Sequence, residues 1–271
     1  MEKSNELRIV MLGKTGAGKS SSGNTILQEP LFPKACSPSS VTKECSKHSK
    51  ETAGRKVSVI DTPGLFDTTL SNKELNNEIA RCIFLTSPGP HVFLVVISMT
   101  AKFTGDEKQS VEWIQETFGK EAGEYTMVLF THGDDLDRPV EEYMAENENL
   151  SQFVSSCKGG YHVFNNKDKT SLTQVTQLLQ KIDALVGRNG GSYYTNDMFR
   201  SVAKAYGLVP VMEFMKDLAE ALAEGVLSEK AKATFEDMAK CGLKSIAINT
   251  VLGAAAVGCS LLLKNRVGLP K

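Results

Sequence analysis

The stretch GKTGAGKS at residues 13–20 decides the fold of this 271-residue chain. It follows the largely apolar run Leu7–Leu12 and precedes Ser21–Leu27, a segment with helical character. A strand, a loop of the form G-x-x-x-x-G-K-S and a helix make a phosphate-binding loop, in which backbone N–H groups and the helix N-terminus hold phosphate oxygens. Lys19 is expected to reach the β- and γ-phosphates as a catalytic cation, and Ser20 to place its hydroxyl on Mg²⁺. We therefore predict a nucleoside-triphosphate site made of Gly13, Lys14, Thr15, Gly16, Ala17, Gly18, Lys19, Ser20 and Ser21.

The composition is that of an ordinary globular protein. Hydrophobic residues make up 41% of the chain and charged residues 23%, which is enough apolar material for a sizeable core. The net charge of -1 gives no nucleic-acid footprint, so no nucleic-acid partner is expected. The six cysteines have neither C-x-x-C nor zinc spacing, and no secretory signal precedes them, so we interpret them as free thiols in a reducing cytoplasm.

Two further segments complete a predicted magnesium site. Arg55–Ile60 alternates as a strand and leads into DTPG at residues 61–64, a D-x-x-G arrangement. Asp61 would hold Mg²⁺ through water and the Gly64 N–H would sense the γ-phosphate; a plain turn is the alternative interpretation. The loop 29–50 is expected to be the first switch, with Thr42 as the candidate that closes onto the metal, although neighbouring Ser and Thr residues compete for this role. The predicted metal ligands are Ser20, Thr42 and Asp61.

Base recognition is predicted where two later strands end. Tyr125–Thr131 has the pattern of a strand and leads into HGDD at 132–135, where guanine-specific proteins place N/T-K-x-D. The Asp135 carboxylate would accept hydrogen bonds from the guanine N1–H and 2-amino group, which adenine lacks, and His132 would stack on the base. An acidic helix N-terminus without a ligand is the alternative interpretation. The short strand and loop Tyr161–Lys167 would present backbone N–H groups to the same base.

The order of the segments predicts the architecture. Strands alternate with helices from residue 7 to residue 186, which indicates a doubly wound α/β sheet with the nucleotide at the carboxyl ends of its strands. We expect a nucleotide-binding domain over residues 6–190, a helical extension over 191–242 and a hydrophobic segment over 243–271. Residues 245–263 carry no charge, and as a helix they would be ~28 Å long, near the hydrocarbon thickness of a bilayer. A membrane-spanning tail anchor, an amphipathic surface helix and a helix folded back onto the protein remain open.

These motifs together resemble the GIMAP family, the GTPases of immunity-associated proteins, which are related to septins and to chloroplast import-receptor GTPases. The resemblance is carried by the stretches 13–27, 40–42, 61–67, 164–167 and 190–199. It implies GTP or GDP and Mg²⁺ as ligands, self-association across the nucleotide face, and a cytoplasmic domain that is often attached to an intracellular membrane. By position, the resemblance also assigns guanine contacts to Asn165 or Asn166 and base recognition to the segment from His132 to Asp135.

Two departures from the family pattern concern affinity and catalysis. Many members have R-K-x-D where this chain has HGDD at 132–135. Some members carry an arginine, proposed as a catalytic finger across the dimer, where this chain has Lys102 before Phe103. Lysine supplies a point cation without the fork of arginine, so Lys102 is predicted as a second and weaker catalytic residue, with a solvated loop lysine as the alternative.

Two functions remain open from the sequence. Ras-like GTPases carry a water-orienting glutamine directly after the glycine of D-x-x-G, and this chain has Leu65 there, so hydrolysis by a monomer should be slow. The first function is a GTP-binding, slowly hydrolysing switch that dimerises; the second is a GTP-dependent scaffold with negligible turnover, which Leu65 and Lys102 favour. An ATP-using enzyme would leave Asp135 without a role.

Overall fold

The computed structural model describes residues 6–33, 42, 44–64, 78, 82, 85–86, 89–100, 120–168 and 171–194. The expectations for Leu65, Lys102 and residues 195–271 therefore lie outside the described part of the chain. Within that part, no helix is long and apolar enough to cross a membrane. Its strands are β1 Glu6–Leu12, β2 Ser46–Thr52, β3 Arg55–Asp61, β4 Val92–Ser98, β5 Thr126–Thr131 and β6 Tyr161–Val163. Its helices are α1 Lys19–Leu27, α4 Val140–Ala145, α5 Glu148–Ser156 and α6 Leu172–Arg188, with 3-10 turns η1 Lys120–Tyr125 and η2 Gly133–Asp135.

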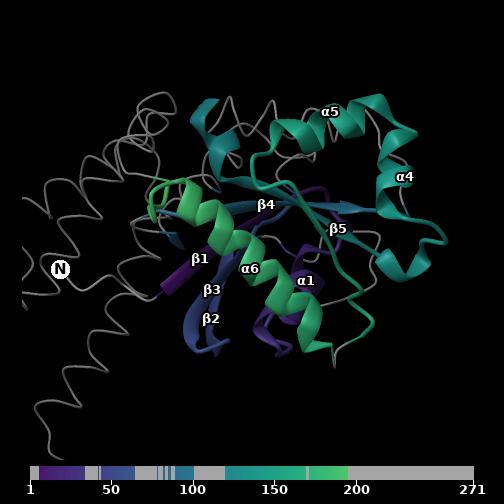
Figure 1. Ribbon diagram of the computed structural model, residues 1–271. Helices are drawn as coiled ribbons and strands as arrows, with labels where there is room; N and C mark the ends of the chain where they lie inside the picture. Colours follow the sequence, from purple (N-terminus) through teal and green to yellow (C-terminus); the bar gives the residue numbers. More distant parts are fainter. Residues whose placement is uncertain are drawn as a thin grey trace, which may run out of the picture. The chain divides into compact units, whose positions relative to one another are not determined.

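The strands form one six-stranded sheet in the order β2-β3-β1-β4-β5-β6 (Figure 1). All neighbouring pairs from β3 to β6 are parallel. The chain leaves the central β1 toward β3 on one side and returns to β4 on the other, which makes the carboxyl end of β1 the switch point where α/β sheets bind ligands. The predicted doubly wound α/β fold is confirmed.

The sequence predicted a loop over residues 29–50, which is wrong at its end, because Ser46–Thr52 form the edge strand β2. Ser46–Thr52 pairs antiparallel with the whole of β3, from Ser46 opposite Asp61 to Thr52 opposite Arg55. The connecting residues Ala53 and Gly54 have φ of 52° and 76°, values that suit a two-residue hairpin turn. The strand was missed because its sequence, SKHSKET, has no apolar residue, as is common where an edge strand faces water.

One face of the sheet is covered by α1 and α6 (Figure 1). Alternate residues of β1, namely Leu7, Ile9 and Met11, belong to the same buried cluster as Ile26 and Leu27 of α1. From α6 the cluster takes Val175, Leu178, Leu179, Ile182 and Leu185. Each such side chain contributes about 1.5–3 kcal/mol when fully buried. Leu172, the first residue of α6, is 62% exposed and lies outside this cluster.

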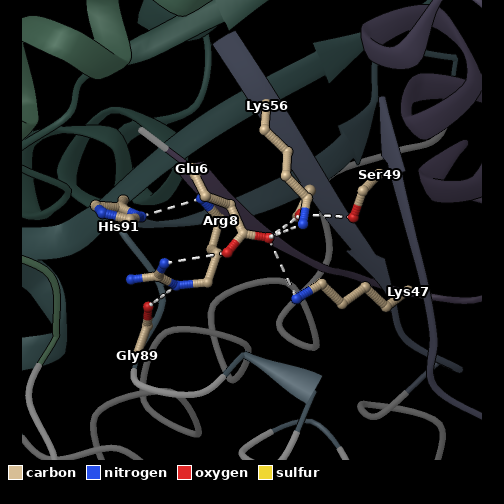
Figure 2. A network of polar contacts seen from close by, with 8 residues as sticks. Glu6, Arg8, Lys47, Ser49, Lys56, Gly89 and His91 are labelled. Atoms are coloured by element: carbon tan, nitrogen blue, oxygen red, sulfur yellow. Dashed lines mark hydrogen bonds and ion pairs between the residues drawn. The ribbon is translucent and has the colours of Figure 1, made fainter. Parts of the chain in front are cut away.

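A polar network lies at the edge of the sheet where β1 and β4 begin (Figure 2). Arg8 is only 1% exposed, and its Nε donates to Gly89 O at 2.6 Å while its guanidinium pairs with Glu6 at 3.5 Å. The Arg8 backbone N–H donates to His91 Nδ1 at 3.0 Å. Glu6 gathers the other partners: it accepts from Ser58 Oγ at 2.5 Å and lies within ion-pair distance of Lys47 and Lys56.

The residues after α6 return to this edge of the sheet. The Tyr193 ring lies 5.0 Å from the Arg8 guanidinium carbon, a cation–π contact. Tyr194 is fully buried, with its ring edge-on to Phe93 at 5.5 Å and to Tyr125 at 5.7 Å. Its N–H donates to the Pro90 carbonyl at 2.9 Å, so the chain is fixed to the sheet as far as residue 194.

Candidate functional site

The loop between β1 and α1 curls around the Lys19 ammonium. Lys19 Nζ donates to Gly13 O at 2.9 Å and to Lys14 O at 2.8 Å, and the side chain is 6% exposed. Gly13 has φ of 146°, and a Cβ there would lie 2.5 Å from the Val96 carbonyl oxygen, so only glycine lets the loop pass over β4. Gly18, with φ of 97°, is the N-cap of α1 and directs its first N–H groups toward the loop. The loop thus has the form that the sequence predicts.

A cavity of about 200 Å³ lies between this loop and the end of β4. Its lining consists of Gly13, Lys14, Thr15, Gly16 and Ala17 from the loop and Val95, Val96, Ile97, Ser98 and Thr100 at the end of β4. Backbone amides and the N-terminus of α1 favour negative charge at this place.

Three hydroxyl and carboxylate groups from distant segments meet beside the loop. Ser20 Oγ donates to Asp61 Oδ2 at 2.5 Å, and Thr42 Oγ1 donates to the same oxygen at 3.4 Å. The two hydroxyl oxygens lie 3.3 Å apart. Ser20 stands at the start of α1, Asp61 ends β3, and Thr42 precedes β2, so the fold brings together the three predicted metal ligands.

Asp61 has an unused oxygen. The residue is 1% exposed, and Asp61 Oδ1 is buried without a hydrogen-bond partner, one of only three such side-chain atoms in the described residues. Burial raises the pKa of Asp61, although the Ser20 hydrogen bond and the Lys19 charge oppose this shift. An unpaired buried acceptor costs about 1–3 kcal/mol, so this carboxylate favours a bound cation or water.

These donors fit Mg²⁺ held together with phosphate. They are all oxygens, which Mg²⁺ prefers, and two hydroxyls with one carboxylate leave positions for phosphate oxygens and water. No group of three or more His, Cys, Asp or Glu side chains that could hold a metal by itself occurs in the part of the chain that the structure describes.

The segment after Asp61 touches the phosphate-binding loop directly. Thr62 Oγ1 donates to the Met11 carbonyl at 2.7 Å and fixes the segment to β1. A Cβ on Gly64 would collide with the Thr15 hydroxyl and lie 2.9 Å from Thr15 N. The glycine of D-x-x-G therefore lies against the loop, and no side chain fits there.

Thr131, at the end of β5, joins the base-recognition segment to the loop. Its Oγ1 donates to the Ala17 carbonyl at 2.8 Å, and the residue is fully buried. The next residue, His132, has φ of 62° and places Nδ1 3.1 Å from both Ser98 Oγ and Thr131 Oγ1. Sequence reasoning missed Thr131, although a signal was present: THGD at 131–134 also has the N/T-x-x-D form, one residue before HGDD.

The structure offers two carboxylates beyond His132. The Asp134 side chain is 18% exposed and the Asp135 side chain 42% exposed. Lys167 bridges both, with Nζ 2.6 Å from Asp134 Oδ2 and 3.0 Å from Asp135 Oδ1. The Lys167 hydrogen bond lowers the pKa of Asp134. The Asp134 side chain is therefore the less exposed of the two, although both residues are exposed as a whole.

The two predicted asparagines hold the loop after β6 in shape. Asn166 accepts from Thr25 Oγ1 at 2.7 Å and donates to Ser22 Oγ at 3.1 Å, which ties this loop to α1. Asn165 Oδ1 accepts from the backbone N–H groups of residues 167 and 168 at 2.8 and 3.2 Å. The side-chain oxygens of Asn165 and Asn166 are therefore both used in hydrogen bonds that hold this loop.

Comparison with known proteins identifies a family. The sequence model of the AIG1 family matches residues 7–209. GTPase IMAP family member 8 of Homo sapiens is 38% identical over 195 residues, which cover 70% of this chain and 29% of that protein. Immune-associated nucleotide-binding protein 9 of Arabidopsis thaliana is 34% identical over 203 residues, which cover 72% of this chain and 59% of that protein. The chain therefore spans less than two thirds of the length of either relative.

Among solved structures, Toc33 from Arabidopsis thaliana in complex with GDP and Mg²⁺ aligns with a TM-score of 0.53 at 22% identity, covering 67% of this chain and 84% of that one. A structure of the chloroplast translocon components atToc33 and psToc159, in which dimerization is important for the GTPase activity, has the same TM-score and covers 67% of this chain and 83% of that one. At this identity the likeness concerns the fold alone.

Proposed function

Because this chain belongs to the AIG1 family, we propose that it binds GTP and GDP with Mg²⁺ at the carboxyl edge of its sheet. We further propose that it acts as a nucleotide-dependent switch that dimerises across that edge. The observation that carries the proposal is the meeting of Ser20, Thr42 and Asp61 beside Lys19, with one Asp61 oxygen buried and unpartnered. The GDP and Mg²⁺ in the Toc33 structure support the same choice of ligands.

Each residue of the cluster has a role in this proposal. Lys19, held over the loop by two carbonyls, would contact the β- and γ-phosphates. Ser20 and Thr42 would turn their hydroxyls from Asp61 to the metal, and Asp61 would hold it through water. Mg²⁺ would neutralise phosphate charge. Since Thr42 would be held by the metal and the γ-phosphate only in the GTP state, loss of the γ-phosphate would release Thr42 from the metal, which is the switching step.

Guanine selectivity is assigned to the pair Asp134 and Asp135. The family position R-K-x-D favours Asp135, whereas the N/T-x-x-D form of THGD and the lower exposure of the Asp134 side chain favour Asp134. Either carboxylate would accept from the guanine N1–H and 2-amino group, while His132, which contacts Ser98 at the end of β4, would stack on the base. Lys167 must share these carboxylates with the base.

A second candidate function is a GTP-dependent scaffold with negligible turnover. Leu65 favours it, because leucine cannot orient a water, and Lys102 would give only a weak cation across a dimer. Attachment to a membrane through residues 245–263 remains a separate proposal, tested by carbonate extraction of the full chain against residues 1–242.

One experiment separates the two functions. Oligomeric state is measured by light scattering in GDP and in a non-hydrolysable GTP analogue, together with single-turnover hydrolysis at increasing protein concentration. A switch dimerises only with the analogue and hydrolyses faster as the concentration rises. A scaffold dimerises without faster hydrolysis. Failure to bind either nucleotide would contradict both functions.

A further inference from the structure

We infer that Gln174, in the first turn of α6, is a positioning residue that sets the base selectivity of the site by holding the loop 164–168. The inference rests on the proposed function, because it assumes that guanine lies against this loop. Gln174 Oε1 accepts from Asn165 N at 2.9 Å, and its Nε2 donates to Asn165 O at 3.0 Å and to Asp168 O at 3.1 Å. One side-chain amide thus pairs with both backbone groups of Asn165, as a neighbouring strand would.

Gln174 is itself fixed from the strand side. The backbone carbonyl oxygen of Gln174 lies 2.9 Å from His162 Nε2, and His162, in β6, is 5% exposed. Burial lowers the pKa of His162 to about 4, so the imidazole is neutral at physiological pH. Because a carbonyl can only accept, the single ring proton of His162 is on Nε2. The first turn of α6 is therefore tied to β6 at the point from which the Gln174 side chain reaches the loop.

The loop transmits its position to both sides of the base site. Asn166, the residue after the one that Gln174 holds, bonds to Ser22 and Thr25 of α1. Lys167, one residue further, bridges Asp134 and Asp135. A shift of the Asn165 backbone would therefore move the loop against the two candidate base-reading carboxylates.

The phosphate-binding part of the site has different supports. Lys19 bonds to carbonyls of its own loop, and Thr131 holds the Ala17 carbonyl. None of these bonds involves α6 or the loop 164–168. Loss of the Gln174 amide should therefore impair recognition of the base and leave the binding of phosphate and Mg²⁺ largely intact.

The test compares Gln174→Leu and Gln174→Glu with the control Gln177→Leu. Gln177 lies on the same helix, one turn further, and is exposed. Leucine removes all three side-chain bonds to the loop. Glutamate keeps the acceptor for the Asn165 N–H but sets a negative charge against two carbonyl oxygens, so it tests the donors and serves as a second variant should leucine unfold the protein. Affinity of each full-length protein for Mg²⁺-GDP and Mg²⁺-ADP is measured by calorimetry, with hydrogen exchange of the loop amides.

The expected result is a fall in GDP affinity of about tenfold for both Gln174 variants, with ADP affinity within about twofold of wild type, because two to three modest hydrogen bonds no longer order the loop. Exchange at residues 165–168 should quicken in both, while Gln177→Leu behaves as wild type. If the wild type prefers GDP but a Gln174 variant loses GDP and ADP affinity equally, or loses neither, the role of Gln174 is overturned and the proposed function is not. A wild type that binds GDP and ADP equally would overturn the proposed function, and the selectivity role with it.

Discussion

The two ends of the parallel strands each place a carboxylate beside a basic side chain, buried for Asp61 and half-buried for Glu6, yet the two carboxylates differ in how many of their oxygens have partners. At the carboxyl edge, Asp61 accepts from two hydroxyls at one oxygen and has no hydrogen-bond partner at the other. At the opposite edge, Glu6 is surrounded by a hydroxyl and three cations (Figure 2). A buried polar group with unused bonding capacity indicates a ligand site, whereas a group with all partners supplied by the chain indicates structure.

The pKa values of the two carboxylates point the same way. For Asp61, burial outweighs the favourable contacts and the pKa is raised. For Glu6, burial also raises the pKa, but the Ser58 hydrogen bond and the charges of Lys47, Lys56 and Arg8 together lower it below its ordinary value. Ionised Glu6 is thus already stabilised by its neighbours, while ionised Asp61 lacks enough positive charge, which bound Mg²⁺ would provide.

The largest expected effect is on stability, from Glu6→Gln. The change leaves the Arg8 guanidinium buried without its carboxylate, which should lower the free energy of unfolding by about 3 kcal/mol, as measured by chemical denaturation. Nucleotide affinity should not change. The matched control is Lys56→Gln. Lys56 pairs with the same carboxylate but its side chain is 54% exposed, so this change should lower the free energy of unfolding by about 0.5 kcal/mol or less. Equal costs for the two variants would show that the network is not a structural one.

The reverse pattern is expected for Asp61→Asn. Removal of the charge should lower the affinity for Mg²⁺-GDP by about 100-fold, since charge-assisted bonds are each worth roughly 1.5–3 kcal/mol. Stability without nucleotide should stay equal or rise by about 1 kcal/mol, because an unpaired buried carboxylate is removed. Calorimetry with and without Mg²⁺ and denaturation of the nucleotide-free protein measure both quantities. A marked loss of stability would mean that Asp61 is structural, as Glu6 is.

Acid should lower the stability of the polar network around Glu6 and Arg8 through protonation of His91. Burial, followed by the charge of Arg8, lowers the pKa of His91 to about 4, and its Nδ1 must be unprotonated to accept the Arg8 N–H. Because the unfolded chain binds this proton below about pH 6.5 and the folded chain only near pH 4, stability should fall by about 2 kcal/mol as pH decreases through this window. Denaturation midpoints at several pH values measure the slope. His91→Gln should reduce this slope and leave the part due to His162, whose pKa is lowered to the same value, and an unchanged slope would show that His91 does not contribute.

The smallest effect separates Asp134 from Asp135. Asp134→Asn should lower GDP affinity by about tenfold and raise affinity for xanthosine diphosphate, because the amide now donates where guanine also donates. Asp135→Asn should change both by less, since its side chain is more exposed. Competition binding with the two nucleotides gives the order. The opposite order would show that HGDD, and not THGD, is the recognition motif.

Much of the fold and of the site follows from local sequence. The phosphate-binding loop, the buried strands and α6 carry short motifs or clear periodicity, and the doubly wound α/β fold was predicted correctly except for the edge strand β2. Ser20, Thr42 and Asp61 were identified as metal ligands from motif spacing, and they lie together, although their role as ligands stays a prediction.

What the sequence could not supply depends on pairing between distant segments. The polar strand β2 is defined only by its bonds to β3, and Arg8 becomes a buried cation only when β4 brings Gly89 beside it. Thr131 could have been found from THGD, but Gln174 contacts the loop after β6 through backbone carbonyls, which no side-chain pattern records. Such residues are recognised only once the strands are in register.

The most direct test of a guanine-nucleotide site at the carboxyl edge is calorimetry on protein stripped of bound nucleotide. We predict that GDP binds with one site per chain, that removal of Mg²⁺ weakens binding, and that ADP binds at least tenfold more weakly because it lacks the base donors. Absence of GDP binding in the presence of Mg²⁺ would contradict the central claim, and the unpartnered oxygen of Asp61 would then need another explanation.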